Sequence, residues 1–277
     1  MSPVARERFA QVVAGSEEEL DLAEAALLIA QEEHPELDIA AYLRQLDGLA
    51  AAVRARLPAA PTPTEITDTL NRYLFHEEGL SGNEHAYYEP SNSFLNEVLD
   101  RKTGIPITLS VIYLEVGRRL GLPLAGVGFP GHFLVKYTGP GGDVVLDPFA
   151  GGSTLTHEHL AQKLRAMYGD SNPFLAQIPR LLAPTGKKEI LVRMLRNLKG
   201  IYLQQGDFAR ALGALDRILL VDPNLAMEVR DRGAVYQRLG HLQAAVQDFR
   251  RYLQLAPNAE DAEAVRTLLK RMAAQLN

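Results

Sequence analysis

Two segments near the end of the chain repeat each other at an interval of 34 residues. YLQQGDFARALGALDRILLVDPN (202–224) aligns without a gap with YQRLGHLQAAVQDFRRYLQLAPN (236–258). Glycine suits a turn between two helices, a small alanine lets paired helices approach closely, and a proline ends each unit. The recurring residues are Tyr202, Gly206, Ala211, Pro223 and Asn224, which correspond to Tyr236, Gly240, Ala245, Pro257 and Asn258. Stacked helical hairpins are therefore predicted for this region.

A helix–turn–helix period of this length with a closing proline resembles the tetratricopeptide repeat (TPR). The resemblance implies an all-α region whose helices bind a protein or peptide partner. Two repeats and a final helix at about 260–275 are few for a freestanding solenoid. We therefore expect the repeats to dock on the first domain.

The composition excludes several kinds of site and partner. Of the 277 residues, 47% are hydrophobic and 23% charged, which is typical of a globular protein with a core. A net charge of −5 argues against nucleic acid as a partner. No apolar run reaches the ~20 residues that cross a bilayer, and no signal-peptide pattern begins the chain, so a cytoplasmic protein that does not enter a membrane is expected. Because cysteine is absent, disulfides, thiolate metal sites and a thiol nucleophile are excluded.

The first part of the chain has the spacing of amphipathic helices. Apolar residues follow helical periodicity through 16–57, with Ser16 as the expected first cap and a second helix from about 39 to 57. A proline-rich connector, 58–65, offers Thr64 as the N-cap of a helix that ends near residue 75. The irregular segment 77–93 is long enough to suggest a functional loop.

A buried helix and a small sheet are predicted next. GIPITLSVIYLEVGRRLGLP (104–123) fits a buried helix with Pro106 in its first turn, where the missing N–H costs nothing. Short strands are predicted near 124–129, 132–138 and 143–148, the last two joined by a hairpin at TGPGG. One helix packed on a small antiparallel sheet defines an α+β domain.

These elements suggest three consecutive parts. We expect an N-terminal helical segment, 1–62, that packs on the core domain. The α+β domain itself is expected over 63–180, and the repeat region over 186–277.

Several strings along the chain resemble one family. They are NRYLF (71–75), GN (82–83), YYEPSNSFLNEVLDRKTGIPITLSVIYLEV (87–116), GVGFPGHFLV (126–135) and DPFAGG (147–152). With the repeats, they resemble the SirB family of bacterial proteins, which join a transglutaminase-like domain to TPRs. A related domain occurs in some eukaryotic F-box proteins. The resemblance implies a papain-like helix-plus-antiparallel-sheet domain followed by repeats.

The same resemblance implies a degenerate catalytic site. The wider superfamily places a catalytic cysteine at the start of a helix, then a histidine and an aspartate on neighbouring strands. Pro106 stands where the cysteine would be, whereas His132 and Asp147 match the other two positions. Proline has no nucleophile and no N–H for an oxyanion, so cysteine-dependent chemistry is excluded. The implied cleft is lined by Asn83, Tyr88, Asn92, Pro106, Ser110, His132 and Asp147, and its ligand is a peptide or small molecule.

Two other interpretations remain open. A hydrolase is possible if Thr108, Ser110 or an activated water reacts, with His132 as base and an ionised Asp147 to orient it. A hydroxyl in mid-helix usually bonds to a preceding carbonyl instead, and Ser93 is expected to N-cap the helix FLNEVLD. Alternatively, the histidine–aspartate pair only stabilises a hairpin, and the chain is a structural adaptor.

No metal or cofactor is expected. His157 and His159 are two residues apart in a helix that Thr156 is predicted to begin, so their side chains face different sides. His76 and His85 lie in or beside the irregular segment and are interpreted as solvated histidines.

Overall fold

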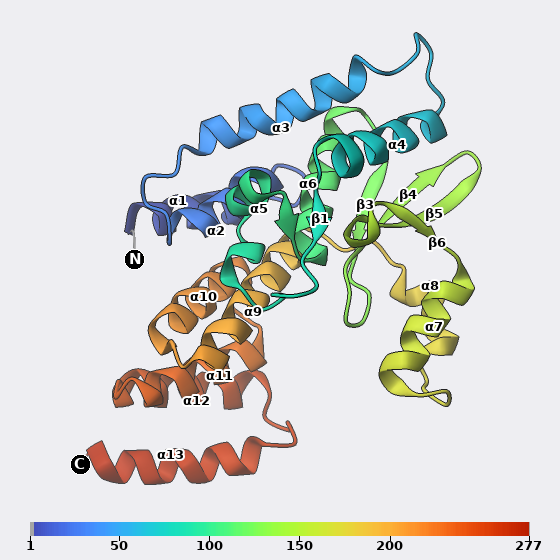
Figure 1. Ribbon diagram of the computed structural model, residues 1–277. Helices are drawn as coiled ribbons and strands as arrows, with labels where there is room; N and C mark the ends of the chain where they lie inside the picture. Colours follow the sequence, from blue (N-terminus) through green and yellow to red (C-terminus); the bar gives the residue numbers. More distant parts are fainter. Residues whose placement is uncertain (1–2, 277) are drawn as a thin grey trace. The chain divides into compact units, whose positions relative to one another are not determined.

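The chain folds into two units, which we describe separately. The computed structural model describes residues 3–276 (Figure 1). The α+β unit comprises Glu17–Ile190, and the repeat unit comprises residues up to Ser16 together with those from Leu191 onward. The first helix, α1 (Pro3–Ala14), therefore belongs to the repeat unit. The expected N-terminal segment 1–62 is thus divided between the two units.

The α+β unit begins with helices and continues into mixed structure. Its helices are α2 (Leu22–Gln31), α3 (Ile39–Arg54), α4 (Pro63–Asn71), α5 (Leu95–Arg101), α6 (Pro106–Arg119), α7 (His157–Tyr168) and α8 (Ile178–Leu181). A π-helical turn η1 (Arg72–Glu77) extends α4, and 3-10 turns form η2 (Pro90–Ser93), η3 (Pro148–Ala150) and η4 (Leu175–Gln177). The most buried of the helices is α6, in which every residue from Pro106 to Gly117 is buried. The predicted central helix is confirmed.

Four antiparallel strands form the main sheet. They are β3 (Leu124–Val127), β4 (Leu134–Gly139), β5 (Gly142–Asp147) and β6 (Ser153–Leu155), ordered as in the sequence. The β4–β5 hairpin turns between Gly139 and Gly142 and pairs Val135 with Leu146, so the predicted hairpin is confirmed. The strand β6 was not predicted, because three residues, of which the first two are exposed, carry too little alternation to signal a strand.

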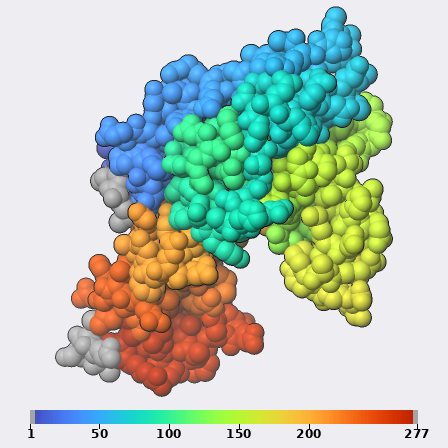
Figure 2. Space-filling view, in the orientation of Figure 1, coloured from blue at the N-terminus to red at the C-terminus, as the bar shows by residue number. Residues whose placement is uncertain are grey.

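Helix α7 packs on this sheet through an apolar cluster. Leu160, Ala161 and Leu164 of α7 contact strand residues that include Val127 and Val145. Figure 2 shows α7 and the segment after it as a yellow projection of the α+β unit. Helix α6 packs against β4 and against the turn η3. The sheet ends that carry His132 and Asp147 are thereby fixed between two helices.

Three of the predicted helix caps are wrong. Helix α4 is capped by Thr62 rather than Thr64, because Thr62 and Glu65 form a reciprocal capping box with Pro63 at the first helical position. Helix α2 is capped by the side chain of Asp21, which accepts from the Glu24 N–H, and not by Ser16. Ser93 ends η2, and Phe94 occupies the N-cap of α5 without a side-chain bond.

A second, parallel sheet was not predicted. It has only two short strands, β1 (Ser81–Gly82) and β2 (Thr103–Gly104), which lie directly before the irregular loop and directly before α6. Their pairing holds both ends of the segment 83–102 at the start of α6.

The repeat unit is entirely helical. Besides α1 it contains α9 (Lys187–Gln205), whose first four residues precede the division, α10 (Phe208–Val221), α11 (Ala226–Arg238), α12 (Leu242–Leu255) and α13 (Ala262–Leu276). Gly206 and Gly240 have φ values of 74° and 77° in the two inter-helix turns, and Ala211 and Ala245 are fully buried. Both roles were predicted from the repeat and are confirmed. No helix within residues 3–276 has the length and apolarity needed to cross a bilayer.

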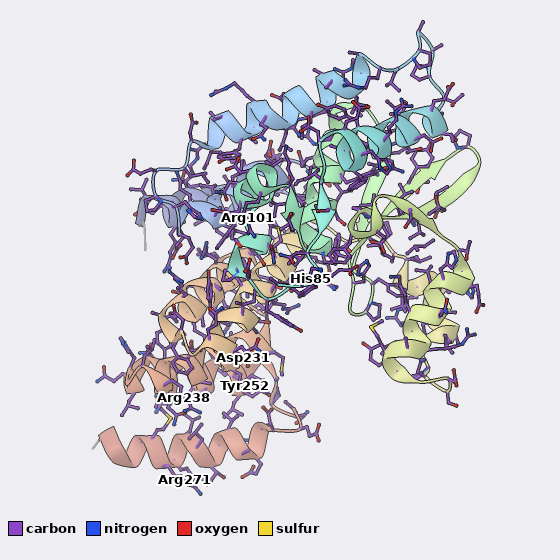
Figure 3. All side chains as sticks on the ribbon, in the orientation of Figure 1. His85, Arg101, Asp231, Arg238, Tyr252 and Arg271 are labelled. Carbon is purple, nitrogen blue, oxygen red and sulfur yellow. The ribbon has the colours of Figure 1, made fainter. Side chains whose placement is uncertain are left out.

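Ion pairs connect the helices of the repeat unit. Glu228 on α11 accepts from Arg196 and Lys199 of α9, at 2.7 and 2.6 Å. Arg230 bonds Asp231 and Asp261, and Asp261 also accepts from the hydroxyl of Tyr252. Figure 3 labels Asp231 on α11 and Tyr252 on α12. These charges serve to connect neighbouring helices.

Candidate functional site

His132 is positioned by a tight turn between β3 and β4. Its backbone N–H donates to the Phe129 carbonyl at 3.0 Å, which places the imidazole two residues before β4 begins. Gly131 has a φ of 66°, and a Cβ there would lie 2.5 Å from the sulfur of Met167. Glycine is therefore required for both the turn and the approach of Met167 on α7.

Asp147 is the last residue of β5 and is almost completely buried, with a side chain 1% exposed. Its Oδ1 accepts from the Phe149 N–H at 3.2 Å, so the carboxylate caps the turn η3. Phe149 lies against Gly82, since a Cβ on that glycine would be 2.6 Å from the ring. The aspartate is thus fixed by the backbone that follows it.

The structure brings His132 and Asp147 together. His132 Nε2 lies 2.8 Å from Asp147 Oδ1, and the imidazole is 13% exposed. Its ring meets Phe149 edge-on, with centroids 5.9 Å apart. An ionised carboxylate only accepts hydrogen bonds, so Nε2 carries the proton and donates. Proton transfer to or from a bound molecule would therefore have to use Nδ1.

A lysine completes the charge arrangement. Lys163 of α7 lies with its Nζ 3.6 Å from Asp147 Oδ2. Burial acts to raise the pKa of Asp147, but the hydrogen bond from His132 and the charges of His132 and Lys163 outweigh it, so this pKa lies below its ordinary value. Asp147 is consequently ionised at neutral pH. Sequence reasoning missed Lys163, since nothing in HEHLAQKLRAMY connects it to an aspartate sixteen residues earlier.

The two candidate hydroxyls are already engaged. Thr108 donates from Oγ1 to the carbonyls of Asn92 and Ile105, at 2.7 and 3.1 Å, and accepts from the Ile105 N–H at 3.2 Å. Ser110 donates to the Phe133 carbonyl at 3.4 Å. Both side chains are fully buried. Each hydroxyl is therefore used to hold α6 in place, which does not favour a nucleophilic role for either.

Two asparagines shape the loop before α5. Asn92 is fully buried and donates to the carbonyls of Ala86 and Tyr87, at 2.7 and 3.4 Å, while it accepts from Asn83 Nδ2 at 3.2 Å. The Ala86 N–H returns a bond to Asn83 Oδ1 at 2.9 Å. The Asn83 N–H donates to the Gly104 carbonyl at 2.9 Å, which connects this network to β2. These residues position the loop from inside.

Tyr88 is the one aromatic side chain of the expected cleft, and it is 65% exposed. It contacts the ring of Tyr87 edge-on, at 5.3 Å between centroids. Figure 3 labels His85 on the same loop, where the imidazole is exposed. Pro106 is buried as the first residue of α6. The candidate residues thus include an exposed tyrosine, a half-buried histidine and several buried side chains.

The two histidines of α7, His157 and His159, begin the helix. Thr156 N-caps the helix and forms a capping box with His159, so the predicted helix start is confirmed. Within residues 3–276, no group of three His, Asp or Glu side chains is arranged to hold a metal ion.

Comparison with known proteins decides the family. Residues 40–196 match the sequence profile of the transglutaminase-like superfamily. The chain belongs to this superfamily. Residues 198–270 match the tetratricopeptide repeat profile, so the transglutaminase-like domain is followed by TPRs, as expected for the α+β and all-α parts.

Several known proteins are similar to this chain over most of its length. A UPF0162 protein of Xylella fastidiosa (strain Temecula1) is 42% identical over 250 residues, which is 90% of this chain and 89% of the relative. A UPF0162 protein of Vibrio cholerae is 33% identical over 71% of this chain and 72% of the relative. The mouse F-box only protein 21 is 29% identical over 64% of this chain but only 28% of its own length. The similarity thus covers a smaller part of the F-box only protein than of the two bacterial relatives.

Proposed function

We propose that this chain is a catalytically degenerate transglutaminase-like protein of the SirB type that acts as a protein-binding or regulatory adaptor. One observation carries the proposal. The chain has no cysteine and begins α6 with Pro106, yet the bonded His132–Asp147 pair is present. A base and its orienting carboxylate without a nucleophile are suited to binding, since the imidazole donates from Nε2 to Asp147 and its other ring nitrogen, Nδ1, is an acceptor.

The TPR unit supplies the protein-binding surface in this proposal. Two large apolar side chains flank the turn between α10 and α11: Leu220 is 40% exposed and Met227 is 49% exposed. Exposed apolar side chains are a common feature of partner sites. Glu228 of α11 is paired with Arg196 and Lys199 of α9, so its charge is compensated within the unit.

The dyad supplies a second contact in the α+β unit. His132 is the partly exposed polar group of the expected cleft and Tyr88 is its exposed aromatic group, and Asn83, Asn92, Pro106 and Ser110 shape their surroundings. A peptide or small ligand at this point donates one hydrogen bond to the imidazole, and Asp147 keeps that ring in one orientation.

Capture of a partner tests the adaptor function. Tagged full-length protein is used to isolate partners, which are identified by mass spectrometry and then purified for a direct binding measurement. Met227→Glu and Leu220→Glu are expected to weaken binding at least tenfold, because each places a charge in an apolar contact. Gln237→Glu on α11 adds the same charge at an exposed polar position and is the matched control.

The same measurement separates the roles of the two units. If His132→Ala weakens binding while its unfolding midpoint is unchanged, the dyad participates in recognition. If His132→Ala changes stability alone, the dyad is structural and the TPR unit acts by itself. A purified partner that binds Met227→Glu, Leu220→Glu and the control with equal affinity would exclude the proposed apolar contact.

A further inference from the structure

A pocket distinct from the expected cleft opens between β6 and α7. Its volume is about 430 Å³, within the range of small-molecule sites. Its lining includes Ser153, Thr154 and Leu155 from β6 and His159, Lys163 and Ala166 from α7. Lys163 is also the residue that contacts Asp147, so the pocket shares one side chain with the His132–Asp147 dyad.

Two hydrogen-bond donors face this pocket from one side of α7. His159 and Lys163 are four residues apart in the helix, so their side chains lie on the same face one turn apart. His159 Nδ1 accepts from the Thr156 N–H at 3.3 Å, which leaves the ring proton on Nε2. In the structure of residues 3–276, neither His159 Nε2 nor Lys163 Nζ has a hydrogen-bond partner. Both groups are therefore able to donate to a ligand.

The ion pair with Asp147 does not occupy the hydrogen-bond donors of Lys163. At 3.6 Å the Nζ–Oδ2 separation is longer than a hydrogen bond, so the lysine contributes its charge without donating to the aspartate. The lysine side chain is 39% exposed and can extend toward the pocket, while the Asp147 carboxylate keeps its hydrogen bonds from His132 and from the Phe149 N–H. Its three N–H groups are consequently available to an anion.

Lys163 lines the pocket and favours an anion there, although the buried Asp147 carboxylate 3.6 Å from its Nζ offsets part of its charge. No acidic side chain lines the pocket. Glu158, the nearest acidic residue in sequence, accepts from Arg165 Nη1 at 2.8 Å, so its charge is compensated on the helix surface. The exposed hydroxyls of Ser153 and Thr154 add donors from β6. Leu155 and Ala166 supply apolar lining, which selects against a purely inorganic ion.

We propose that this pocket binds a small organic carboxylate with a short apolar or aromatic body. The carboxylate receives hydrogen bonds from Lys163 Nζ and His159 Nε2, and the apolar body packs against Leu155 and Ala166. Lys163 contacts Asp147 and also lines the pocket. When an anion binds, the Lys163 ammonium group moves toward it and away from Asp147, which changes the electrostatic environment of His132. The proposal does not depend on the TPR unit binding a protein.

Fluorine NMR with 4-fluorobenzoate tests the pocket directly on the full-length protein. Saturable binding of the fluorinated probe is expected for wild-type protein, and in a parallel proton NMR titration the ring signals of both His159 and His132 should shift along the same curve. Lys163→Met is expected to weaken binding at least tenfold, because it keeps the apolar stem and removes the charge. Lys163→Arg keeps the charge and is expected to retain binding within about threefold.

Controls separate this site from loss of folding or nonspecific attraction. Lys136→Gln removes a lysine whose partner is Asp143 in the β4–β5 hairpin, and it should bind the probe like wild type. His159→Gln keeps a side chain that can complete the capping box and should bind more weakly than wild type. The neutral 4-fluorobenzamide should not bind. Equal binding to Lys163→Met, equal binding of the amide, competition by inorganic phosphate as strong as by benzoate, or absence of saturation would each overturn the proposal.

Discussion

The start of α6 and the adjoining ends of β4 and β5 use polar side chains in opposite ways. At the start of α6, Thr108 and Ser110 are neutral, fully buried and bonded to backbone carbonyls. At the strand ends, Asp147 is ionised, His132 is partly exposed, and Lys163 adds a positive charge. A buried neutral hydroxyl that is satisfied by the backbone stabilises the fold, whereas a partly exposed charged group can change its partner. The first region is therefore structural, and the second is the place where recognition is expected.

The largest effect is expected for Asn92→Ala. Asn92 belongs to the structural region because its backbone carbonyl accepts a hydrogen bond from Thr108 at the start of α6. Asn92 is fully buried and makes hydrogen bonds with two carbonyls and with Asn83. Truncation leaves these groups unsatisfied, and we expect a loss of about 3 kcal/mol in the free energy of unfolding. Urea denaturation measures it, with Tyr88→Ala as an exposed control in the same loop. A loss no larger than that of the control would show that the network does not hold the loop.

An intermediate and pH-dependent effect is expected for Asp147→Asn. The pKa of Asp147 is lowered in the folded state, so its ionised form stabilises the protein above the unfolded pKa, near 4, and this contribution is lost as the pH falls through the folded pKa. At pH 7 the variant should be less stable by about 1–2 kcal/mol. The difference from wild type should shrink between pH 5 and pH 2.

Urea titrations at several pH values measure this difference. Asp170→Asn, at an exposed position of the same unit, is the matched control. A difference that stays constant from pH 7 to pH 2 would mean that the charge of Asp147 does not stabilise the folded state.

The smallest effect is expected for Ser110→Ala. The Ser110 hydroxyl makes one long hydrogen bond to the Phe133 carbonyl. Its removal should change stability by less than about 1 kcal/mol. Binding of 4-fluorobenzoate should be unchanged, because Ser110 does not line the β6–α7 pocket. A large loss of ligand binding in Ser110→Ala at unchanged stability would move this residue from the structural region to the recognition region.

Much of the fold was accessible from the sequence. The repeat glycines and alanines, the position of Pro106 at the first turn of α6 and the hairpin at TGPGG depend on local backbone rules, and the structure contains all of them. The pairing of His132 with Asp147 followed from the family resemblance, and the distance between them is that of a hydrogen bond. Local rules and a shared motif were sufficient for these features.

The remaining features depend on contacts between distant segments. Whether Asn92 faces a cleft or the interior is decided by its neighbours Ala86 and Asn83 and by the placement of α6, which no local pattern encodes. The contact of Lys163 with Asp147 requires β6 and α7 to return to the end of β5. The caps at Ser16 and Thr64 were wrong because Asp21 and Thr62 were also able to cap these helices, and the cap at Ser93 was wrong because α5 begins without a side-chain cap.

The most direct test of the proposal that the site is catalytically degenerate is a sensitive assay for transamidation and hydrolysis with purified wild-type protein and His132→Ala. Peptides bearing glutamine, together with activated esters, serve as substrates. Without a cysteine and with both hydroxyls bonded to backbone carbonyls, wild type and variant should give the same background rate. Turnover by wild-type protein that disappears in a folded His132→Ala variant would contradict the account and identify the chain as an enzyme.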